Sequence, residues 1–307
     1  MAADEPLARH TTLRIGGPAD FFVEPETETG LRALLSLCRE YGVDVHFLGQ
    51  GSNVLVPDEG VRGVVLTTRR LYRHCTFAGT EVTAGSGCAL GRLVQLSLER
   101  GLGGLEPLAG IPGTVGGAVF MNAGTPSGSI ADRLTWVRLI DLSGEESLLT
   151  PAEMGFAYRT SRLQREPGRL VAEVGLHLEP APQASTELLR AAAARRRKTQ
   201  PLEYPNAGSI FRNPPGDYAG RLIEAVGAKG LSVGGAQISP LHANFIVNTG
   251  GATAADVLEL MRIARGLVRQ RFGLTLVPEI RLFGAPPGAV ERRLDEGGGE
   301  SGGALPD

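Results

Sequence analysis

The sequence predicts an α+β protein built from three regions, and three observations support this prediction. Strand-like and helix-like segments alternate between residues 20 and 67. Longer strand patterns dominate residues 68–180, where they surround a glycine-rich segment. A Pro-Ala-Pro run at 180–182 is typical of a linker and precedes a third, more helical region. A chain of 307 residues is long enough for two or three domains with cores of their own.

The first region has the pattern of a small α/β unit. A short strand is expected at 20–23. An amphipathic helix is expected over 27–41, because apolar residues recur on one face and Gly42 follows as a stop. Two buried strands are expected at 45–48 and 64–66.

The second region is expected to be richer in strands. Strands are predicted at 82–84 and 134–142, and a helix over 90–100 is ended by Gly101. Residues 169–178 alternate, so that every second side chain is apolar and points one way. These elements predict an α+β region around the glycine-rich segment.

The third region is expected to hold two helices and a closing strand. The first helix covers 185–198 and ends in the basic run Arg195–Lys198, which is typical of a solvated helix end and can also contact phosphate. Thr253 begins the second helix as a cap, and Gly273 ends it. A strand is expected over 274–283.

The composition excludes several classes of protein. A hydrophobic share of 42%, a charged share of 21% and a net charge of −2 give no electrostatic case for binding nucleic acid or an anionic membrane. No apolar stretch approaches the roughly 20 residues that span a bilayer, and the acidic N-terminus does not resemble a signal peptide. We therefore expect a cytoplasmic protein without membrane insertion.

The cysteines and histidines predict neither a disulfide framework nor a metal site. The three cysteines are widely spaced, and the five histidines show no paired ligand spacing. Each is expected to be structural or solvent-facing. Any redox chemistry must then come from an organic cofactor.

A glycine-rich segment at 110–118, closed by Asn-Ala-Gly at 122–124, is the most informative part of the chain. Glycine permits positive φ and a close backbone approach to a ligand, and consecutive N–H groups form an anion site. The segment therefore predicts a phosphate-binding loop, although a packing turn is the alternative. Its candidate cofactor-binding residues are Gly110, Ile111, Pro112, Gly113, Thr114, Gly116, Gly117, Asn122, Ala123 and Gly124.

A second glycine loop follows the expected strand at 45–48. It lacks the third glycine of the GxGxxG fingerprint, so the usual dinucleotide fold is disfavoured. With the longer loop it predicts one extended dinucleotide held between two subdomains, and FAD suits a protein without redox metals. The candidate residues are Gly49, Gln50, Gly51, Ser52 and Asn53.

Three further residues are candidates for chemistry. Ser209 follows a glycine where a turn is expected to become a strand, so its hydroxyl can donate a proton or simply bond its own turn. Arg159 follows Tyr158 and can clamp a carboxylate, or form a surface ion pair. Glu279 stands in an apolar segment, where it points either toward a ligand or outward.

Six segments, in this order, resemble the UDP-N-acetylenolpyruvoylglucosamine reductase (MurB) family, flavoenzymes that make UDP-N-acetylmuramate for bacterial peptidoglycan. The resemblance spans roughly residues 8–284. The segments that carry it are Thr12–Gly17, Leu48–Asn53, residues 110–124, Tyr158–Arg159, Asn206–Ser209 and Pro278–Arg281.

The resemblance implies a fold. Two subdomains of the vanillyl-alcohol-oxidase (PCMH-like) type would hold FAD, over residues 1–67 with the strand 274–284, and over 68–180. A C-terminal α+β substrate-binding domain would cover 185–273. The tail 285–307 is expected to be disordered for a separate reason, because it is rich in proline, glycine and charged residues. The chain resembles the shorter type of the family, which lacks an inserted tyrosine-bearing loop.

The resemblance also implies the chemistry. NADPH reduces FAD, and a hydride then passes to C-3 of the enolpyruvyl ether of a UDP-sugar. Arg159 and Glu279 would stabilise the resulting charge, with Glu279 protonated or bonded through a proton, and Ser209 would protonate C-2. One buried cleft would bring these groups together. Further substrate contacts are expected from Tyr158, Lys198, Arg212 and Asn213.

FAD is expected to bind noncovalently to a monomer. Many relatives in the wider superfamily tether FAD through a histidine in the first glycine loop, where this chain has Ser52. Two alternatives stay open at this point. One is another FAD oxidoreductase acting on small alcohols, and the other is a nucleotide-sugar sensor without turnover.

Overall fold

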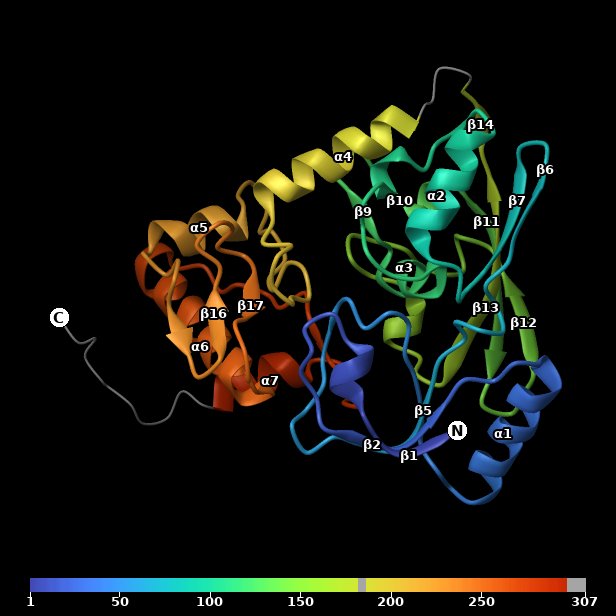
Figure 1. Cartoon of the computed structure of the whole chain (residues 1–307), viewed down its shortest axis with the longest axis horizontal. Helices are drawn as coiled ribbons and strands as arrows, with labels where there is room; N and C mark the ends of the chain where they lie inside the picture. The colour runs from blue at the N-terminus through green and yellow to red at the C-terminus, as the bar shows by residue number, and fades with distance from the viewer. Residues whose placement is uncertain (182–185, 297–307) are drawn as a thin grey trace. The chain divides into compact units, whose positions relative to one another are not determined.

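The computed structural model describes residues 1–181 and 186–296 (Figure 1). Two compact units make up the chain. The first contains Met1–Glu5, Pro18–Ser52 and Val61–Lys198. The second contains Pro6–Gly17, Asn53–Gly60 and the described residues from Thr199 onward. The domain boundaries expected at 67/68 and 273/274 stay predictions.

A four-stranded sheet forms one end of the first unit. Helix α1 (Glu28–Glu40) connects two of its strands and begins at Thr27, whose hydroxyl accepts the N–H of Gly30 at 3.1 Å. Strands β2 and β3 each pair with β5 in parallel, as expected when a helix connects neighbouring strands. The sheet order is β1 (Ala2–Pro6), β2 (Pro18–Val23), β5 (Val61–Leu66) and β3 (Val45–Phe47).

A five-stranded antiparallel sheet is the second large sheet of this unit, and Figure 1 shows its strands side by side. Helices α2 (Leu90–Glu99) and α3 (Val115–Met121) belong to the same unit, and their apolar faces pack in one core cluster with β7 and β13. The sheet order is β12 (Glu146–Leu149), β11 (Leu134–Asp141), β13 (Arg169–His177), β7 (Glu81–Gly85) and β6 (Cys75–Ala78).

The expected one-sided alternation of residues 169–178 is wrong. Leu170 and Ala172 pack in the cluster that contains α1, whereas Val171 and Val174 pack in the cluster that contains α2 and α3. The register between β11 and β13 shifts at this point. An extra residue in one strand changes which side chains face each side, so a period-two pattern does not continue through it.

Shorter elements complete the first unit. Helix α4 (Thr186–Thr199) confirms the helix expected over 185–198, except that residue 185 lies outside the described residues. The remaining short elements are strands β8 (Leu102–Gly103), β9 (Gly124–Thr125), β10 (Gly128–Ser129) and β14 (Glu179–Pro180), with 3₁₀ turns η2 (Glu106–Leu108), η3 (Ile130–Asp132) and η4 (Arg162–Gln164).

The second unit is built around helix α6 (Ala254–Phe272). Thr253 and Asp256 form the expected capping box, and Gly273 ends the helix with φ +67°. Asp58 adds to the cap, because its carboxylate accepts the N–H groups of Ala254 and Ala255 at 2.7 and 3.1 Å. The other elements are η1 (Leu7–His10), α5 (Ala219–Ala225) and an antiparallel sheet of β15 (Ser232–Val233), β16 (Ala236–Ile238) and β17 (Ile246–Asn248).

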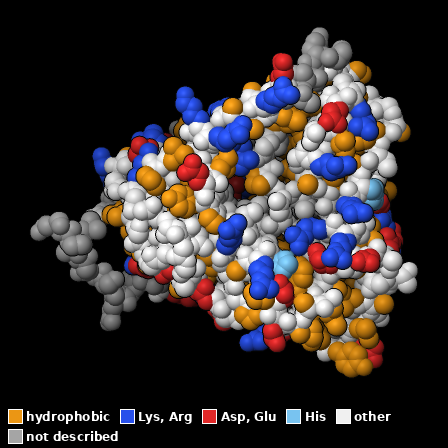
Figure 2. All heavy atoms as spheres, viewed as in Figure 1, with side chains coloured by type: hydrophobic (Ala, Val, Ile, Leu, Met, Phe, Trp, Pro, Cys, Tyr) orange, Lys and Arg blue, Asp and Glu red, His pale blue; other side chains and the backbone are white. Residues whose placement is uncertain are grey.

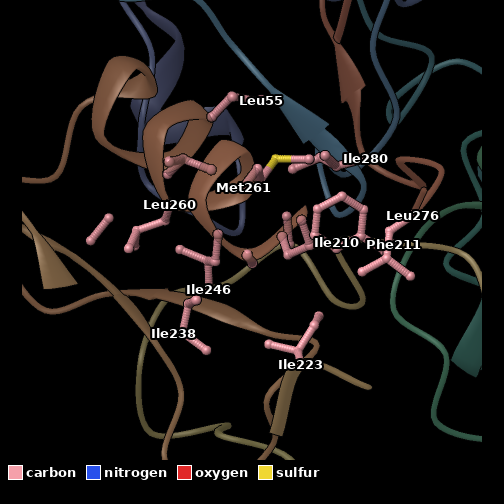
Figure 3. Packing of buried hydrophobic residues seen from close by; sticks show 14 of the residues in the cluster. Leu55, Ile210, Phe211, Ile223, Ile238, Ile246, Leu260, Met261, Leu276 and Ile280 are labelled. Carbon is pink, nitrogen blue, oxygen red and sulfur yellow. The ribbon is translucent and has the colours of Figure 1, made fainter. Parts of the chain in front are cut away.

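The core of the second unit lies between α6 and the segments that carry two of the candidate residues. Figure 3 shows Leu260 and Met261 of α6 together with Phe211, Ile210 and Ile280, all of them buried. Ile210 directly follows Ser209 and Ile280 directly follows Glu279, so a packed hydrophobic cluster fixes the backbone next to both residues.

The strand expected over 274–283 is wrong for most of its length. Only β18 (Arg281–Leu282) is a strand, paired in parallel with β4 (Val54–Leu55). Pro278 cannot donate to a ladder, and the N–H groups of Glu279 and Ile280 both point to the carbonyl of Ile210, at 2.7 and 3.4 Å. The segment is a bend rather than a continuous strand.

The tail is not disordered over its first part. Residues 289–296 form helix α7, and its Val290 and Leu294 are buried in the core of the second unit. Arg265 of α6 pairs with Asp295 at 2.6 Å. Two apolar residues at i and i+4 give one face for packing, and the charged composition of the tail hides this signal. Residues 297–307 lie outside the described residues.

Within the described residues, no helix is long and apolar enough to cross a bilayer.

Figure 2 shows hydrophobic side chains on the surface in the region of α1. Leu37 and Tyr41, at the end of this helix, are 53% and 71% exposed, whereas Leu31 and Leu35 on its other face are buried. The helix is therefore amphipathic, as the sequence predicts.

Candidate functional site

The two glycine loops of the first unit contact each other. Ser52 donates its hydroxyl to the carbonyl of Pro112 at 3.1 Å. A Cβ on Gly49 would lie 2.8 Å from the hydroxyl oxygen of Thr114, and one on Gly113, which has φ +139°, would lie 3.3 Å from that of Ser52. Glycine is therefore required where the loops approach each other.

The longer loop rests on the backbone that follows β7. Val115 donates its N–H to the carbonyl of Cys88, and Gly116 donates to Ser86, both at 2.9 Å. Gly117 donates to the Thr114 hydroxyl at 3.2 Å as α3 begins. These N–H groups already bond within the protein. The N–H groups expected to bind an anion must therefore come from other positions in the two loops.

The carbonyl of Gly110 accepts a hydrogen bond from the guanidinium of Arg196, on α4. Gly110 has φ +79°, and a Cβ there would lie 2.7 Å from the Arg196 side chain. Arg196 is half-buried, and burial lowers its pKa. Arg196 belongs to the basic run Arg195–Lys198 that the sequence predicts at this helix end. By contrast, Lys198, the expected substrate contact in this run, is exposed.

Arg159 sits in a tight two-residue turn. Ala157 and Thr160 exchange backbone hydrogen bonds of 3.1 and 3.0 Å around it. Arg159 has φ +53°, a left-handed conformation that costs free energy in a residue with a Cβ and that marks functional positions more often than others. Its guanidinium carbon lies 5.1 Å from the centroid of the Tyr158 ring, which is itself exposed.

Two buried amides hold this turn on the end of α3. Gln164 donates to the carbonyls of Arg159 and Phe120, at 3.1 and 2.9 Å. Asn122, which ends α3 with φ +44°, donates to the carbonyl of Ala157 at 3.0 Å. The helix that follows the glycine loop therefore also fixes the backbone of Arg159.

Ser209 lies in the second unit, in an irregular segment between two isolated backbone bridges. The expected turn-to-strand transition is therefore wrong in its second half. Asn206 shapes the approach to it, since its side chain accepts the N–H of Gly208 at 3.0 Å and donates to the carbonyls of Tyr204 and Pro201. Gly208 has φ +76°, and Ser209 is half-buried.

A buried asparagine fixes the residues that follow Ser209. The side-chain oxygen of Asn244 accepts the N–H of Phe211 at 3.0 Å, and its amide donates to the carbonyl of Phe211 at 2.8 Å. The backbone carbonyl of Asn244 also accepts the N–H of Ile210, at 2.9 Å. Asn244 is only 3% exposed. It is a positioning residue that the sequence analysis missed.

Glu279 lies beside the Ser209 segment within the second unit. Its N–H donates to the carbonyl of Ile210, the residue after Ser209, at 2.7 Å. Its own carbonyl accepts from the side chain of Asn53 at 3.1 Å. The half-buried Glu279 therefore has its backbone fixed from both sides.

Glu279 lines a small pocket together with Arg212, Arg281 and Glu291. Burial lowers the pKa of Arg281, while the carboxylate of Glu291 raises it and the positive charge of Arg212 lowers it. Charges of both signs therefore gather around the Glu279 segment. Arg212 is itself placed by a backbone bond to Val277, at 2.8 Å.

Asn213 has a structural role in the second unit. Its side-chain oxygen accepts the N–H of Ala219 at 3.1 Å, in the first turn of α5. A side chain that caps a helix is less able to bind a ligand, so Asn213 is the weaker of the expected substrate contacts.

The structure therefore divides the predicted site residues between the two units. Among the described residues, no group of three or more His, Cys, Asp or Glu side chains could hold a metal ion. The first unit carries both glycine loops up to Ser52, together with Tyr158, Arg159 and Lys198; the second carries Asn53, Ser209, Arg212, Asn213 and Glu279. The signal for the missed Asn244 was a single polar side chain within an apolar stretch at 243–247.

Two family models match separate parts of the chain. Residues 19–148 match a family model described as an FAD binding domain, and residues 200–283 match the C-terminal domain of UDP-N-acetylenolpyruvoylglucosamine reductase. UDP-N-acetylenolpyruvoylglucosamine reductase 2 of Symbiobacterium thermophilum is 50% identical over 284 residues, which is 92% of each chain. The corresponding reductase of Moorella thermoacetica is 50% identical over 92% of this chain and 93% of its own.

A solved structure gives the same result. The crystal structure of UDP-N-acetylenolpyruvylglucosamine reductase (MurB) from Thermus caldophilus matches with a TM-score of 0.75 and 42% identity, over 91% of this chain and 97% of that one. The expected FAD-binding fold with a separate C-terminal domain is confirmed. Relatives that are half identical over nine-tenths of the sequence establish the relationship: this chain belongs to the UDP-N-acetylenolpyruvoylglucosamine reductase family.

Proposed function

We propose that this chain is a cytoplasmic FAD-dependent reductase that converts UDP-N-acetylglucosamine enolpyruvate to UDP-N-acetylmuramate with NADPH, a step in peptidoglycan precursor synthesis. Membership of the family supports the reaction. The single observation that supports the assignment of residues is the backbone bond between Glu279 and Ile210, because it holds a carboxyl group next to the hydroxyl-bearing Ser209 segment.

The two glycine loops fit a dinucleotide with its diphosphate. They approach each other so closely that a Cβ on Gly49 would collide with Thr114. Glycines at such positions allow a ligand to approach the backbone itself, without a side chain in between. When bound, FAD accepts a hydride from NADPH and supplies it to C-3 of the enolpyruvyl ether. Ser52 stands where a tethering histidine would be needed, and its hydroxyl bonds Pro112, so we infer noncovalent binding.

Arg159 is assigned the carboxylate of the enolpyruvyl group. Reduction at C-3 builds negative charge at C-2 and on that carboxylate. A planar guanidinium can stabilise this charge by donating two parallel hydrogen bonds to the carboxylate. The turn that holds Arg159 at φ +53°, fixed by Gln164 and Asn122, supports a preorganised role.

Ser209 is assigned as the donor that protonates C-2. An aliphatic hydroxyl is a weak acid, but an enolate is a strong enough base to take its proton when the two atoms are within hydrogen-bond reach. Glu279 is assigned to the same charge. It can stabilise an enolate only if it carries or shares a proton, because a bare carboxylate would repel it.

The UDP moiety needs cationic and aromatic contacts. Arg212 supports this role because it lines the same pocket as Glu279. Tyr158 and Lys198 are both exposed and are proposed as further contacts, whereas Asn213 is already used as a helix cap.

The function can be tested with the purified flavoprotein. We expect NADPH consumption to require UDP-N-acetylglucosamine enolpyruvate and to give a product heavier by two hydrogens in mass spectrometry. Fast NADPH oxidation with oxygen alone, and none with the enolpyruvyl substrate, would instead indicate an oxidase of small molecules. Yellow colour that stays in an acid-precipitated pellet would contradict noncovalent FAD.

A further inference from the structure

Two cysteines that the proposed reaction does not use lie in contact within the first unit. The sulfur atoms of Cys75 and Cys88 are 3.4 Å apart, and both residues are free thiols. Cys75 lies on β6 opposite Ala84, and Cys88 follows β7 in a turn where its N–H bonds the carbonyl of Gly85. Sulfurs in a disulfide are about 2.05 Å apart, so closure needs an approach of roughly 1.4 Å.

The surroundings of the pair favour oxidation. Cys88 is 1% exposed and Cys75, in contact with it, is half-buried, so a small oxidant reaches the pair from the side of Cys75. A hydrogen bond from Cys75 lowers the pKa of Cys88, burial opposes this and the positive charge of Arg92 adds to it. The same hydrogen bond and burial raise the pKa of Cys75, while Arg92 and Arg100 lower it. A lowered thiol pKa beside a positive charge favours the thiolate, so Cys88 is the attacking sulfur and Cys75 is the second thiol.

Cys88 is also connected to the longer glycine loop. Its carbonyl accepts the N–H of Val115 at 2.9 Å, and the N–H of Leu90, two residues on, donates to the carbonyl of Gly113 at 3.0 Å. A displacement of Cys88 therefore shifts the backbone of the loop that we assign to FAD, because hydrogen bonds connect the two. The third cysteine, Cys38, lies in a different core cluster, and its carbonyl accepts the N–H of Val43, far from the glycine loop in the sequence.

We propose that Cys75 and Cys88 form a peroxide-sensitive dithiol, and that its closure to a disulfide loosens the binding of FAD. The thiolate of Cys88 attacks one oxygen of hydrogen peroxide: a sulfur–oxygen bond forms, the oxygen–oxygen bond breaks, and the hydroxide released takes the proton that the thiol gave up and becomes water. The second sulfur then attacks the sulfenic acid. A sulfur–sulfur bond forms, the sulfur–oxygen bond breaks, and the hydroxide that leaves combines with the proton of the second thiol to give water. Two thiols are oxidised and one peroxide is reduced.

The first test counts thiols in the holoenzyme. Treatment with hydrogen peroxide, followed by unfolding and alkylation, should leave one of three thiols in the wild type, with a mass loss of two hydrogens that dithiothreitol reverses. C38S should still lose both remaining thiols, whereas C75S and C75A should form no intramolecular disulfide. Three alkylated thiols in the peroxide-treated wild type, or a pairing that needs Cys38, would overturn the proposal.

The second test measures flavin release and rests on the proposed placement of FAD at this loop. On dilution, wild type with the Cys75–Cys88 disulfide should release FAD at least fivefold faster than wild type with both thiols free. The release is followed by the fluorescence of free flavin. C75S treated with peroxide should release FAD at the same rate as untreated wild type. A disulfide that leaves the release rate unchanged would overturn the connection to the loop. The thiol count does not depend on the enzyme's substrate, so failure of the proposed reaction would be seen separately.

Discussion

The N–H of Glu279 donates to the carbonyl of Ile210 at 2.7 Å, and this bond joins two segments that are almost 70 residues apart in the sequence. Ile210 directly follows Ser209, so a carboxyl-bearing residue and a hydroxyl-bearing residue share one rigid backbone arrangement. Phe211 and Ile280, the neighbours on either side of this bond, are buried in the same core. The placement of the proposed proton donor Ser209 and of Glu279 therefore depends on core packing as well as on the two side chains.

Asn244 should be essential for this arrangement. Asn244→Ala leaves the N–H and C=O of Phe211 without their partner in a buried environment, so we expect the free energy of unfolding to fall by about 2–4 kcal/mol. Activity should fall further than the fraction of folded protein explains, because Ser209 loses its anchor. Urea unfolding and kcat of the folded fraction measure the two effects. Asn213→Ala, which removes only an exposed helix cap, is the control and should cost about 1 kcal/mol or less.

Arg159 should show a conflict between stability and activity. Its left-handed φ of +53° suits glycine better than arginine, so Arg159→Gly should unfold at equal or higher urea concentration than the wild type. We expect its kcat/KM for the enolpyruvyl substrate to fall at least a hundredfold, about 2.7 kcal/mol of transition-state stabilisation. Arg159→Lys keeps the charge without the planar fork and should be intermediate. A glycine variant with wild-type turnover would show that the strained conformation has no catalytic purpose.

The contact between the two glycine loops should control cofactor binding. Gly49→Ala puts a methyl group 2.8 Å from the Thr114 hydroxyl, so the loops must separate. We expect FAD affinity to fall at least tenfold, measured by flavin fluorescence during titration of the apoprotein. Gly91→Ala on α2, where no heavy atom lies within 4 Å of the new methyl group, should bind FAD like the wild type. Equal affinities of the two variants would place the cofactor elsewhere.

Glu28 should make the first unit sensitive to acid. Burial raises its pKa, but hydrogen bonds from Arg32, Tyr72 and Arg138 outweigh burial and lower the pKa to about 2. A depressed carboxyl pKa adds stability above the unfolded value near 4.5, and this stability is lost as pH falls toward 2. Allowing for partial exposure, we expect the difference in unfolding free energy between wild type and Glu28→Gln to be about 1–2 kcal/mol at pH 6 and to shrink at pH 3. The same difference at both pH values would contradict this assignment.

The sequence predicted the elements with strong local signals and failed where distant contacts decide. Helix α6 was predictable because Thr253 caps it and Gly273 ends it. Helix α7 was missed because the residues around Val290 are charged and glycine-rich. Its short apolar face is stabilised by packing against the core that contains α6, which no local pattern reveals. The strand expected near Glu279 was wrong because Ile210, far away in the sequence, takes its hydrogen bonds.

The candidate site shows the same division. Ser209, Arg159 and Glu279 were predicted because their motifs match a family in order and spacing, and their roles stay predictions. The residues that hold them were not, because Asn244 and Gln164 act through backbone groups that no local pattern connects to them. A single amide in an apolar stretch gives no indication of which distant carbonyl it will bond.

Separate measurement of the two half-reactions of Ser209→Ala tests the central claim most directly. In anaerobic stopped-flow experiments, we expect NADPH to reduce the bound flavin at the wild-type rate, because no proton from Ser209 is needed. Reoxidation of the flavin by the enolpyruvyl substrate should slow by a hundred- to ten-thousandfold, the usual contribution of a general acid. Ser232→Ala, an exposed serine of the same unit, should change neither rate. An equal loss in both half-reactions, or none in the second, would contradict the proton-donor role.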